Sequence, residues 1–60
     1  MDSKLLTVAE AARVLRLGRS KVYELVMSGA LRSITIGRAR RVPVEALDEF
    51  IRARAERSLG

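Results

Sequence analysis

The chain has 60 residues, of which 48% are hydrophobic and 32% charged, and its formal net charge is +5. A chain this short has room for one small core and buries only ~60% of its unfolded surface, so we expect a single domain over residues 1–60. Cysteine and histidine are absent, as are a membrane-spanning apolar run and a secretion signal, so we expect a cytoplasmic, non-enzymatic protein without disulfides, metal or cofactor.

The first predicted helix spans residues 8–15. Thr7 and Glu10 have the spacing of a capping box, in which the side chain of each residue accepts a hydrogen bond from the backbone N–H of the other. Apolar residues then recur at helical intervals along one face: Val8, Ala11, Ala12 and Leu15. The residues before this helix, 1–5, are expected to be frayed.

A second predicted helix begins after Gly18 and ends before Gly29, which stands where helix ends commonly take left-handed backbone. On one side of this helix lie Val22, Leu25 and Val26. Roughly opposite them lie Ser20, Glu24 and Met27. Two short helices joined by a tight, glycine-containing turn are typical of a helix-turn-helix, although many helical hairpins share this spacing.

The next segment predicts a two-stranded hairpin. Residues 32–36 alternate and are rich in β-branched side chains, which indicates a strand with Ile34 and Ile36 facing inward. Gly37 supplies the turn, and residues 40–43 return as the second strand. A hairpin with arginines at and just after its tip is typical of a wing.

A third helix is predicted from Pro43, which suits a first helical turn, to about Arg57. Glu45 then lies near the positive end of the helix dipole, and residues 58–60 are expected to be frayed. Fourteen mostly aliphatic residues make up the predicted core: Val8, Ala11, Ala12, Leu15, Val22, Leu25, Val26, Leu31, Ile34, Ile36, Val42, Leu47, Phe50 and Ile51.

These elements predict an α+β fold that is mostly helical. The arrangement is a winged helix-turn-helix of three helices, with a two-stranded β-hairpin wing between the second and the third.

Basic residues are concentrated in the middle of the chain. Residues 11–43 contain eight arginines and lysines and a single acid, Glu24, so this stretch carries +7, whereas residues 1–10 and 44–60 each carry −1. A basic middle between near-neutral ends is typical of a protein that binds nucleic acid. An arginine-rich solvated surface and a membrane surface as partner are the other interpretations of the charge alone.

Four motifs follow one another along the chain: LLTVAEAA at residues 5–12, RSKVY at 19–23, SGAL at 28–31, and IGRARRVP with EAL within 36–47. In this order they resemble the opening helix, the start of the recognition helix, the passage to the wing, and the wing with the closing helix of one family. That family is the small excisionase and MerR-type winged helix-turn-helix DNA-binding domains. The resemblance covers residues 5–54, and the order of the four motifs makes it fairly specific for the fold.

Two positions depart from the family's pattern. The family often has glycine where Arg16 stands and serine where Gly18 stands. Glycine before a helix costs only a few tenths of a kcal/mol relative to a capping side chain, and Arg16 could instead contact a phosphate. Full-length MerR-type regulators also carry a dimerisation helix and an effector domain, which do not fit here, so no small-molecule effector is expected.

The second helix is the candidate for the major groove, where base edges present a distinct pattern of donors and acceptors. Its candidate DNA-binding residues are Arg19, Ser20, Lys21, Tyr23 and Glu24. Arginine can donate to guanine and glutamate can accept from cytosine, but Glu24 is equally placed to pair with Lys21. The ring of Tyr23 is expected to pack while its hydroxyl meets phosphate; plain core packing is the alternative.

The wing supplies the second group of candidates, Arg38, Arg40 and Arg41. They would enter a minor groove or contact the flanking backbone, unless the hairpin tip is simply solvated. Arg13 and Arg16 of the first helix are candidate phosphate contacts.

The third helix carries a candidate protein-contact face made of Asp48, Glu49 and Arg52. An ordinary solvated surface explains these residues equally well.

The resemblance implies a function in recombination. An excisionase binds double-stranded DNA beside an attachment site, bends that DNA and directs an integrase toward excision, with protomers stacked head to tail about one helical turn apart. The expected location is then the nucleoid in the cytoplasm. A small stand-alone transcriptional regulator of the same fold is the alternative, and a protein adaptor that does not bind DNA is a third interpretation.

Overall fold

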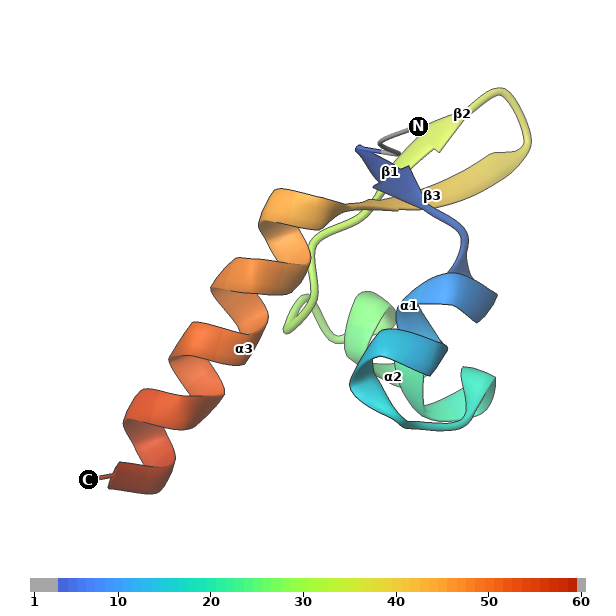
Figure 1. Cartoon of the computed structure of the whole chain (residues 1–60). Coiled ribbons are helices and arrows are strands. Elements are labelled where there is room, and N and C mark those ends of the chain that lie inside the picture. The colour runs from blue at the N-terminus through green and yellow to red at the C-terminus, as the bar shows by residue number, and fades with distance from the viewer. Residues whose placement is uncertain (1–3, 60) are drawn as a thin grey trace.

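Three helices and a three-stranded antiparallel sheet form the fold in the computed structural model, which describes residues 4–59 (Figure 1). The elements follow in the order β1 Leu5–Leu6, α1 Val8–Leu15, α2 Arg19–Met27, β2 Ile34–Ile36, β3 Ala39–Pro43 and α3 Val44–Leu59. The predicted α+β class is confirmed, because β2 and β3 form a wing between α2 and α3.

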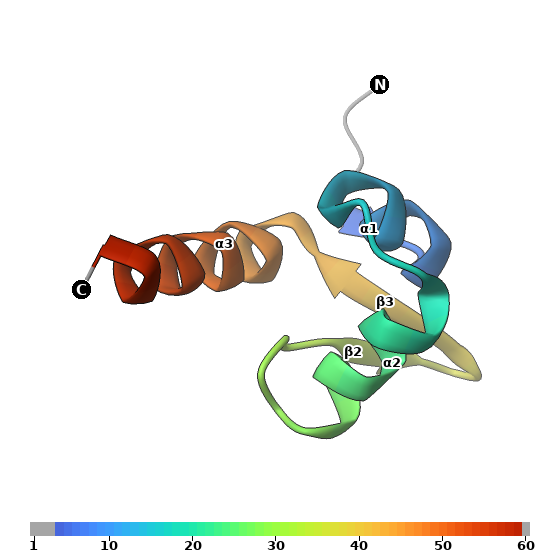
Figure 2. The same ribbon diagram turned by 90° about the horizontal axis from the view of Figure 1, so that it is seen from below.

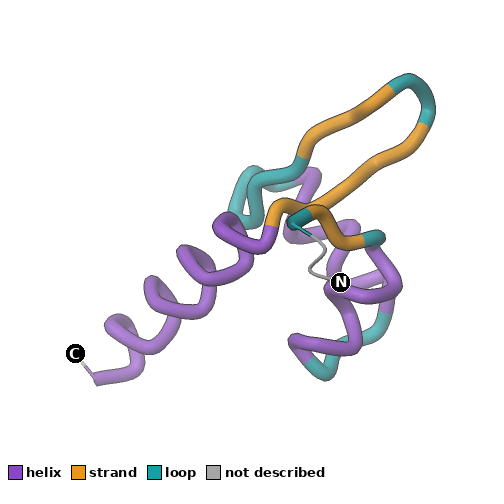
Figure 3. Tube along the Cα trace, turned by 45° about the horizontal axis from the view of Figure 1, so that its top comes forward, coloured by secondary structure: helices purple, strands orange, loops and turns teal. Residues whose placement is uncertain are grey.

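The helices α1 and α2 pack together on one side of the sheet, below it in Figure 1. Seen from below, α2 crosses in front of the hairpin (Figure 2). The turn between β2 and β3 projects in one direction and α3 runs away from the body in the opposite one (Figure 3). The wing tip and the free end of α3 therefore mark the two ends of a molecule that measures 39 × 26 × 17 Å.

The capping box predicted at the start of α1 is formed. Thr7 Oγ1 accepts a hydrogen bond from the backbone N–H of Glu10 at 3.0 Å, and Glu10 Oε1 accepts one from that of Thr7 at 2.8 Å. Two backbone N–H groups at the helix start, which have no partner within the helix, are thereby satisfied by side chains three residues away in sequence. Both predicted ends of this helix, Val8 and Leu15, are confirmed.

The first helix ends on a residue in left-handed backbone. Arg16 has φ 58° and ψ 43°, and it is the sole residue other than glycine with positive φ among residues 4–59. Its backbone N–H donates to Arg13 O at 3.2 Å, and that of Leu17 donates to Ala12 O at 2.9 Å. These bonds close the helix in a way that glycine would permit at lower conformational cost.

The second helix has the predicted ends. Gly18 precedes it in extended backbone, and its carbonyl accepts from Val22 N at 3.2 Å without any side-chain cap. Gly29 follows its end with φ 85°, as predicted from the need for left-handed backbone there.

A third strand, which the sequence did not predict, adds the start of the chain to the sheet. In β1, Leu5 pairs with Pro43 and Leu6 with Val42, so β3 is the central strand. The expectation of a frayed start is wrong for Leu5, because this residue is part of the sheet. The preceding residue, Lys4, is also held, since its carbonyl oxygen accepts a hydrogen bond from Val44 N at 2.9 Å. The rest of that expectation concerns residues 1–3, outside the described part of the chain. Pro43 ends β3 instead of lying inside the first turn of α3.

The inward direction predicted for Ile34 and Ile36 is wrong, since both are exposed. Ile34 pairs with Arg41 in the hairpin, and directly paired residues project from the same face. Neighbouring residues of a strand project from opposite faces, and Val42, next to Arg41, is fully buried beneath the sheet. Both isoleucines therefore lie on the face turned away from α1 and α2.

The core lies between the two short helices, the sheet and the first turns of α3. Its buried residues are Val8, Ala11, Ala12, Val22, Leu25, Leu31, Val42, Ala46 and Leu47, and Leu6, Leu15, Val26 and Phe50 pack partly against them.

Ala46 is a core residue that the sequence prediction missed, whereas Ile51 is exposed and its predicted burial is wrong. The reason is that α3 leaves the body after Phe50, and every later residue up to Ser58 is exposed. Helical structure continues to Leu59, so the fraying expected from residue 58 is wrong for Ser58 and Leu59, and Gly60 lies outside the described residues.

Candidate nucleic-acid interface

One face of α2 is free of packing within the molecule. Val22 and Leu25 turn into the core, and a helix places residues about 100° apart around its axis. Ser20, Glu24 and Met27 consequently form the stripe opposite the core. The structure exposes all five residues predicted for the recognition helix, Arg19, Ser20, Lys21, Tyr23 and Glu24.

The ion pair proposed as an alternative role for Glu24 is present. Lys21 Nζ lies 3.7 Å from Glu24 Oε1, and both side chains are largely exposed. Exposed pairs of this kind contribute little stability, so both side chains are free to exchange this contact for one with DNA. Tyr23 is 47% exposed, which excludes plain core packing and leaves part of its ring on the surface.

The wing arginines do not share one surface. Arg38 is exposed in the two-residue turn, where Gly37 supplies the positive φ of 62°. Arg40 and Arg41 are half-buried on β3 and, as neighbours in a strand, project from opposite faces. Arg40 shares its face with the buried Val42, so it lies on the side of the sheet that α1 and α2 occupy.

A hydrogen bond positions the side chain of Arg40. Its Nη1 donates to Ser33 Oγ at 2.8 Å. Ser33 was not among the predicted site residues, because its hydroxyl comes within reach only through the hairpin register, in which Thr35 is the direct partner of Arg40. Arg41 Nη1 instead donates to the carbonyl oxygen of Arg40 at 2.9 Å, which holds its guanidinium near the strand on the other face.

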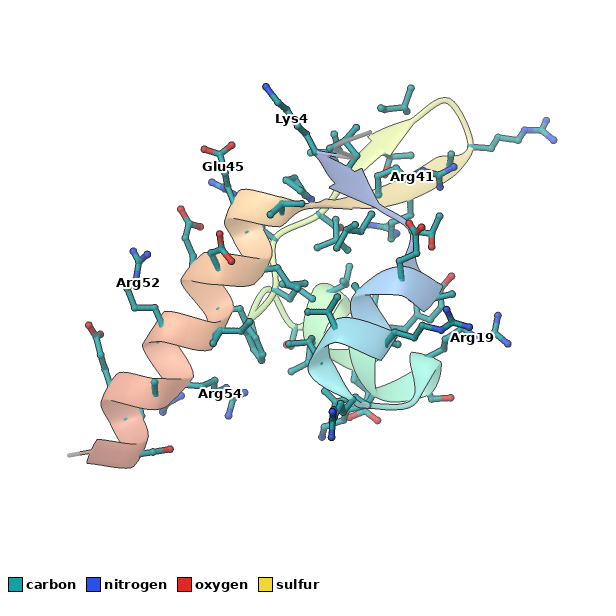
Figure 4. All side chains as sticks on the ribbon, viewed as in Figure 1. Lys4, Arg19, Arg41, Glu45, Arg52 and Arg54 are labelled. Atoms are coloured by element: carbon teal, nitrogen blue, oxygen red, sulfur yellow. The ribbon has the colours of Figure 1, made fainter. Side chains whose placement is uncertain are left out.

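The candidate phosphate contacts of the first helix, Arg13 and Arg16, are exposed near its C-terminal end. Because the connection to α2 spans only a few residues, Arg16 stands close in sequence to Arg19 at the start of α2. In Figure 4 Arg19 and Arg41 lie on the side of the molecule that carries the wing, whereas Glu45 and Arg52 project from the far side of α3.

The predicted protein-contact residues are brought together on one side of α3. Asp48, Glu49 and Arg52 are exposed and, with Glu45, line a shallow open depression. Glu49 Oε1 also lies 3.4 Å from Arg32 Nη2, in an exposed ion pair that links α3 to the segment between α2 and β2. Four of the seven acids of the chain are on α3 together with three arginines, so this helix is nearly neutral, whereas the helix-turn-helix and its wing are strongly basic.

Within residues 4–59, no three acidic, cysteine or histidine side chains gather where they could hold a metal ion. The same part of the chain contains no helix with the length and apolar composition needed to cross a membrane.

A helix-turn-helix with an unpacked second helix beside an arginine-bearing wing defines a DNA-binding protein of the winged helix-turn-helix class. The sequence matches the family described as helix-turn-helix domain over residues 5–55, and the chain belongs to that family. It is 52% identical over 48 residues to an excisionase of Streptomyces ambofaciens, a match that covers 80% of this chain and 77% of that protein. It is therefore a small DNA-binding protein of the excisionase group, a class without enzymatic activity.

A second relative is longer. A probable excisionase of Saccharopolyspora erythraea is 56% identical over 46 residues, and the match covers 77% of this chain and 47% of that protein. The chain thus spans about half the length of this relative. No solved structure matches the chain.

Proposed function

We propose that the chain acts as an excisionase, which binds duplex DNA beside an attachment site and directs an integrase toward excision. In this proposal the integrase performs the strand chemistry, and the protein acts on DNA of the nucleoid in the cytoplasm. The similarity to the Streptomyces ambofaciens excisionase over most of both chains supports the proposal. The resemblance to MerR-type domains supports the same placement of α2 in the major groove.

The observation that carries the DNA-binding half of the proposal is the unpacked face of α2. Arg19 at its start is exposed and free to donate to a guanine. Arg38 at the wing tip and Arg40 on the helix side of the sheet would contact phosphates or the neighbouring minor groove. We also propose that the bound duplex is bent, so that α2 and the wing both contact it.

The shape of the molecule supports head-to-tail assembly on DNA. Its longest dimension is 39 Å, close to the ~34–36 Å of one helical turn. Protomers bound one turn apart on the same side of a duplex would therefore be near enough to touch. The exposed side of α3 carries both signs of charge, with Asp48 and Glu49 beside Arg52. It would then be available to oppositely charged groups of a neighbour or of an integrase.

The experiment that tests the proposal is recombination in vitro with candidate attachment-site DNA and the integrase that acts on it. We expect the protein to stimulate excision and to protect two or more sites spaced about one helical turn apart. Arg19→Ala should weaken both effects. A protein that protects specific DNA but does not alter excision would be a transcriptional regulator of the same fold, and the proposal would be wrong.

The role of α3 is tested separately with Asp48→Arg and Arg52→Glu. Both variants should bind a single DNA site normally but lose cooperative binding or stimulation of excision. Arg57→Ala is the matched control, because it lies on the same exposed helix but on its opposite side. Normal assembly and excision by the charge-reversed variants would contradict the assignment of this face.

A further inference from the structure

We propose that Met27 recognises the 5-methyl group of thymine in the major groove. The proposal rests on the proposed placement of α2 and adds to it a residue that determines sequence preference. Met27 is 76% exposed, the highest value among the exposed large hydrophobic residues of the described chain. It lies in the last turn of α2, beyond the residues assigned to base contact so far.

Met27 lies on the exposed stripe of α2 that would face the duplex in the proposed placement. It follows Ser20 by seven residues, which is close to two turns, so the two side chains lie on the same stripe. That stripe is opposite Val22, which is completely buried. The fold itself does not use the Met27 side chain, since the hydrophobic core cluster closes on α2 through Val22, Leu25 and Val26.

The chemistry of the side chain fits one feature of the groove. Thymine is the standard base that presents an apolar group, its 5-methyl, at the major-groove edge. A thioether is flexible and polarisable, so it can adapt to such a group without the geometry that a hydrogen bond requires. Arg19, Ser20 and Glu24 can recognise donors and acceptors, but none of them is suited to a methyl group.

The spacing predicts where the thymine stands. Seven residues of helix rise roughly 10 Å, and successive base pairs are separated by ~3.4 Å. The thymine should therefore lie about three base pairs from the base that faces Ser20. Burial of one methyl group corresponds to a change of about fourfold in affinity.

The test replaces each thymine of a footprinted site with deoxyuridine, which lacks only the 5-methyl group, and measures Kd for every duplex. The wild-type protein should lose about fourfold in affinity at one or two positions. Met27→Ala should bind the thymine and uracil duplexes equally at those positions, and Met27→Leu should keep most of the discrimination. A cytosine there should weaken binding, and 5-methylcytosine should recover part of the loss.

Val14→Ala is the matched control, because Val14 is 56% exposed but lies on α1 away from this stripe. It should retain the full response to uracil. The proposal is overturned if no uracil position matters to a wild-type protein that still prefers its site, or if Met27→Ala loses affinity equally on both duplexes. Absence of any site preference in the wild type would instead refute the placement of α2 and this proposal with it.

Discussion

Arg40 and Ser33 are joined by a 2.8 Å hydrogen bond across the base of the wing, and this contact positions the Arg40 guanidinium on the side of the sheet that α1 and α2 occupy. A planar guanidinium with five donors retains several N–H groups for phosphate after one is used. Arg41, one residue further, projects from the other face. The wing therefore contains one arginine pre-positioned on the side of α2 and one directed away from it.

We predict that Arg40→Ala weakens DNA binding roughly tenfold, whereas Arg41→Ala changes it by less than about threefold. The cause is the face on which each side chain lies, because the loss of charge is the same. Gel-shift titrations with both variants at one salt concentration measure the difference. Ser33→Ala should fall between them, since it keeps the Arg40 charge and removes only its support. Equal losses for the two arginines would contradict the assigned faces.

Replacement of Arg16 by glycine should stabilise the fold. A residue with a side chain in left-handed backbone costs ~1–2 kcal/mol, and the extra chain entropy of glycine offsets roughly half of that. We expect Arg16→Gly to raise the free energy of unfolding by about 0.5–1 kcal/mol in urea titrations. If Arg16 also contacts a phosphate, the same variant binds DNA more weakly although it is more stable.

Arg13→Gly is the matched control for this substitution. Arg13 is exposed within α1 and has ordinary helical backbone, so glycine there should lower the free energy of unfolding by about 1 kcal/mol. Destabilisation by both glycine variants would show that the backbone of Arg16 is not under strain.

The capping box should contribute about 1 kcal/mol to stability through Thr7. Thr7→Ala removes the acceptor for Glu10 N and leaves an N–H of the first turn without a partner. Thr7→Ser and Glu10→Gln preserve the pattern and should change the free energy of unfolding by only a few tenths of a kcal/mol. Thermal unfolding of these three variants is measured by circular dichroism. It distinguishes the loss of the capping hydrogen bond from the effect of any substitution at these positions.

The helix-turn-helix could be predicted from sequence because its signals are local. Thr7 and Glu10 fix the start of α1, Gly18 separates the two helices, and Gly29 ends the second. Each of these residues affects the backbone only within a few positions of it in the sequence, so periodicity and capping locate the elements. The exposed residues of α2 follow from the same periodicity, and so this part of the candidate interface was also predictable.

The errors occur where the outcome depends on contacts distant in sequence. Alternation shows that Ile34 and Ile36 share a face, but the direction of that face is decided by the register with Arg41 and the burial of Val42. The pairing of Leu5 with Pro43 joins residues far apart in the chain and has no local signal. The apolar stripe of α3 continues to Ile51, although the body that it would pack against ends near Phe50.

The buried and exposed apolar residues should respond very differently to substitution. Leu31 is almost completely buried, so Leu31→Ala should cost ~2–5 kcal/mol, comparable to the ~3–5 kcal/mol that a core of this size supplies in total. Ile36→Thr should change the free energy of unfolding by no more than about 0.5 kcal/mol, because the side chain lies on the outer face of the wing. Chemical denaturation tests both, and a large loss for Ile36→Thr would restore the inward direction predicted from the sequence alone.

Arg19 and the phosphate-contacting arginines should differ in how they depend on DNA sequence and on salt. Arg19→Ala removes a candidate donor to guanine, so it should cost about 1–3 kcal/mol on the specific site and much less on random duplex. Arg38→Ala and Arg13→Ala should weaken binding to both duplexes alike. With four to five phosphate contacts, log K should fall against log salt with a slope of about −4, and each phosphate variant should reduce that slope by about one. A steep slope unchanged by these variants would place the contacts elsewhere on the basic surface, and an equal loss on both duplexes for Arg19→Ala would remove it from base recognition.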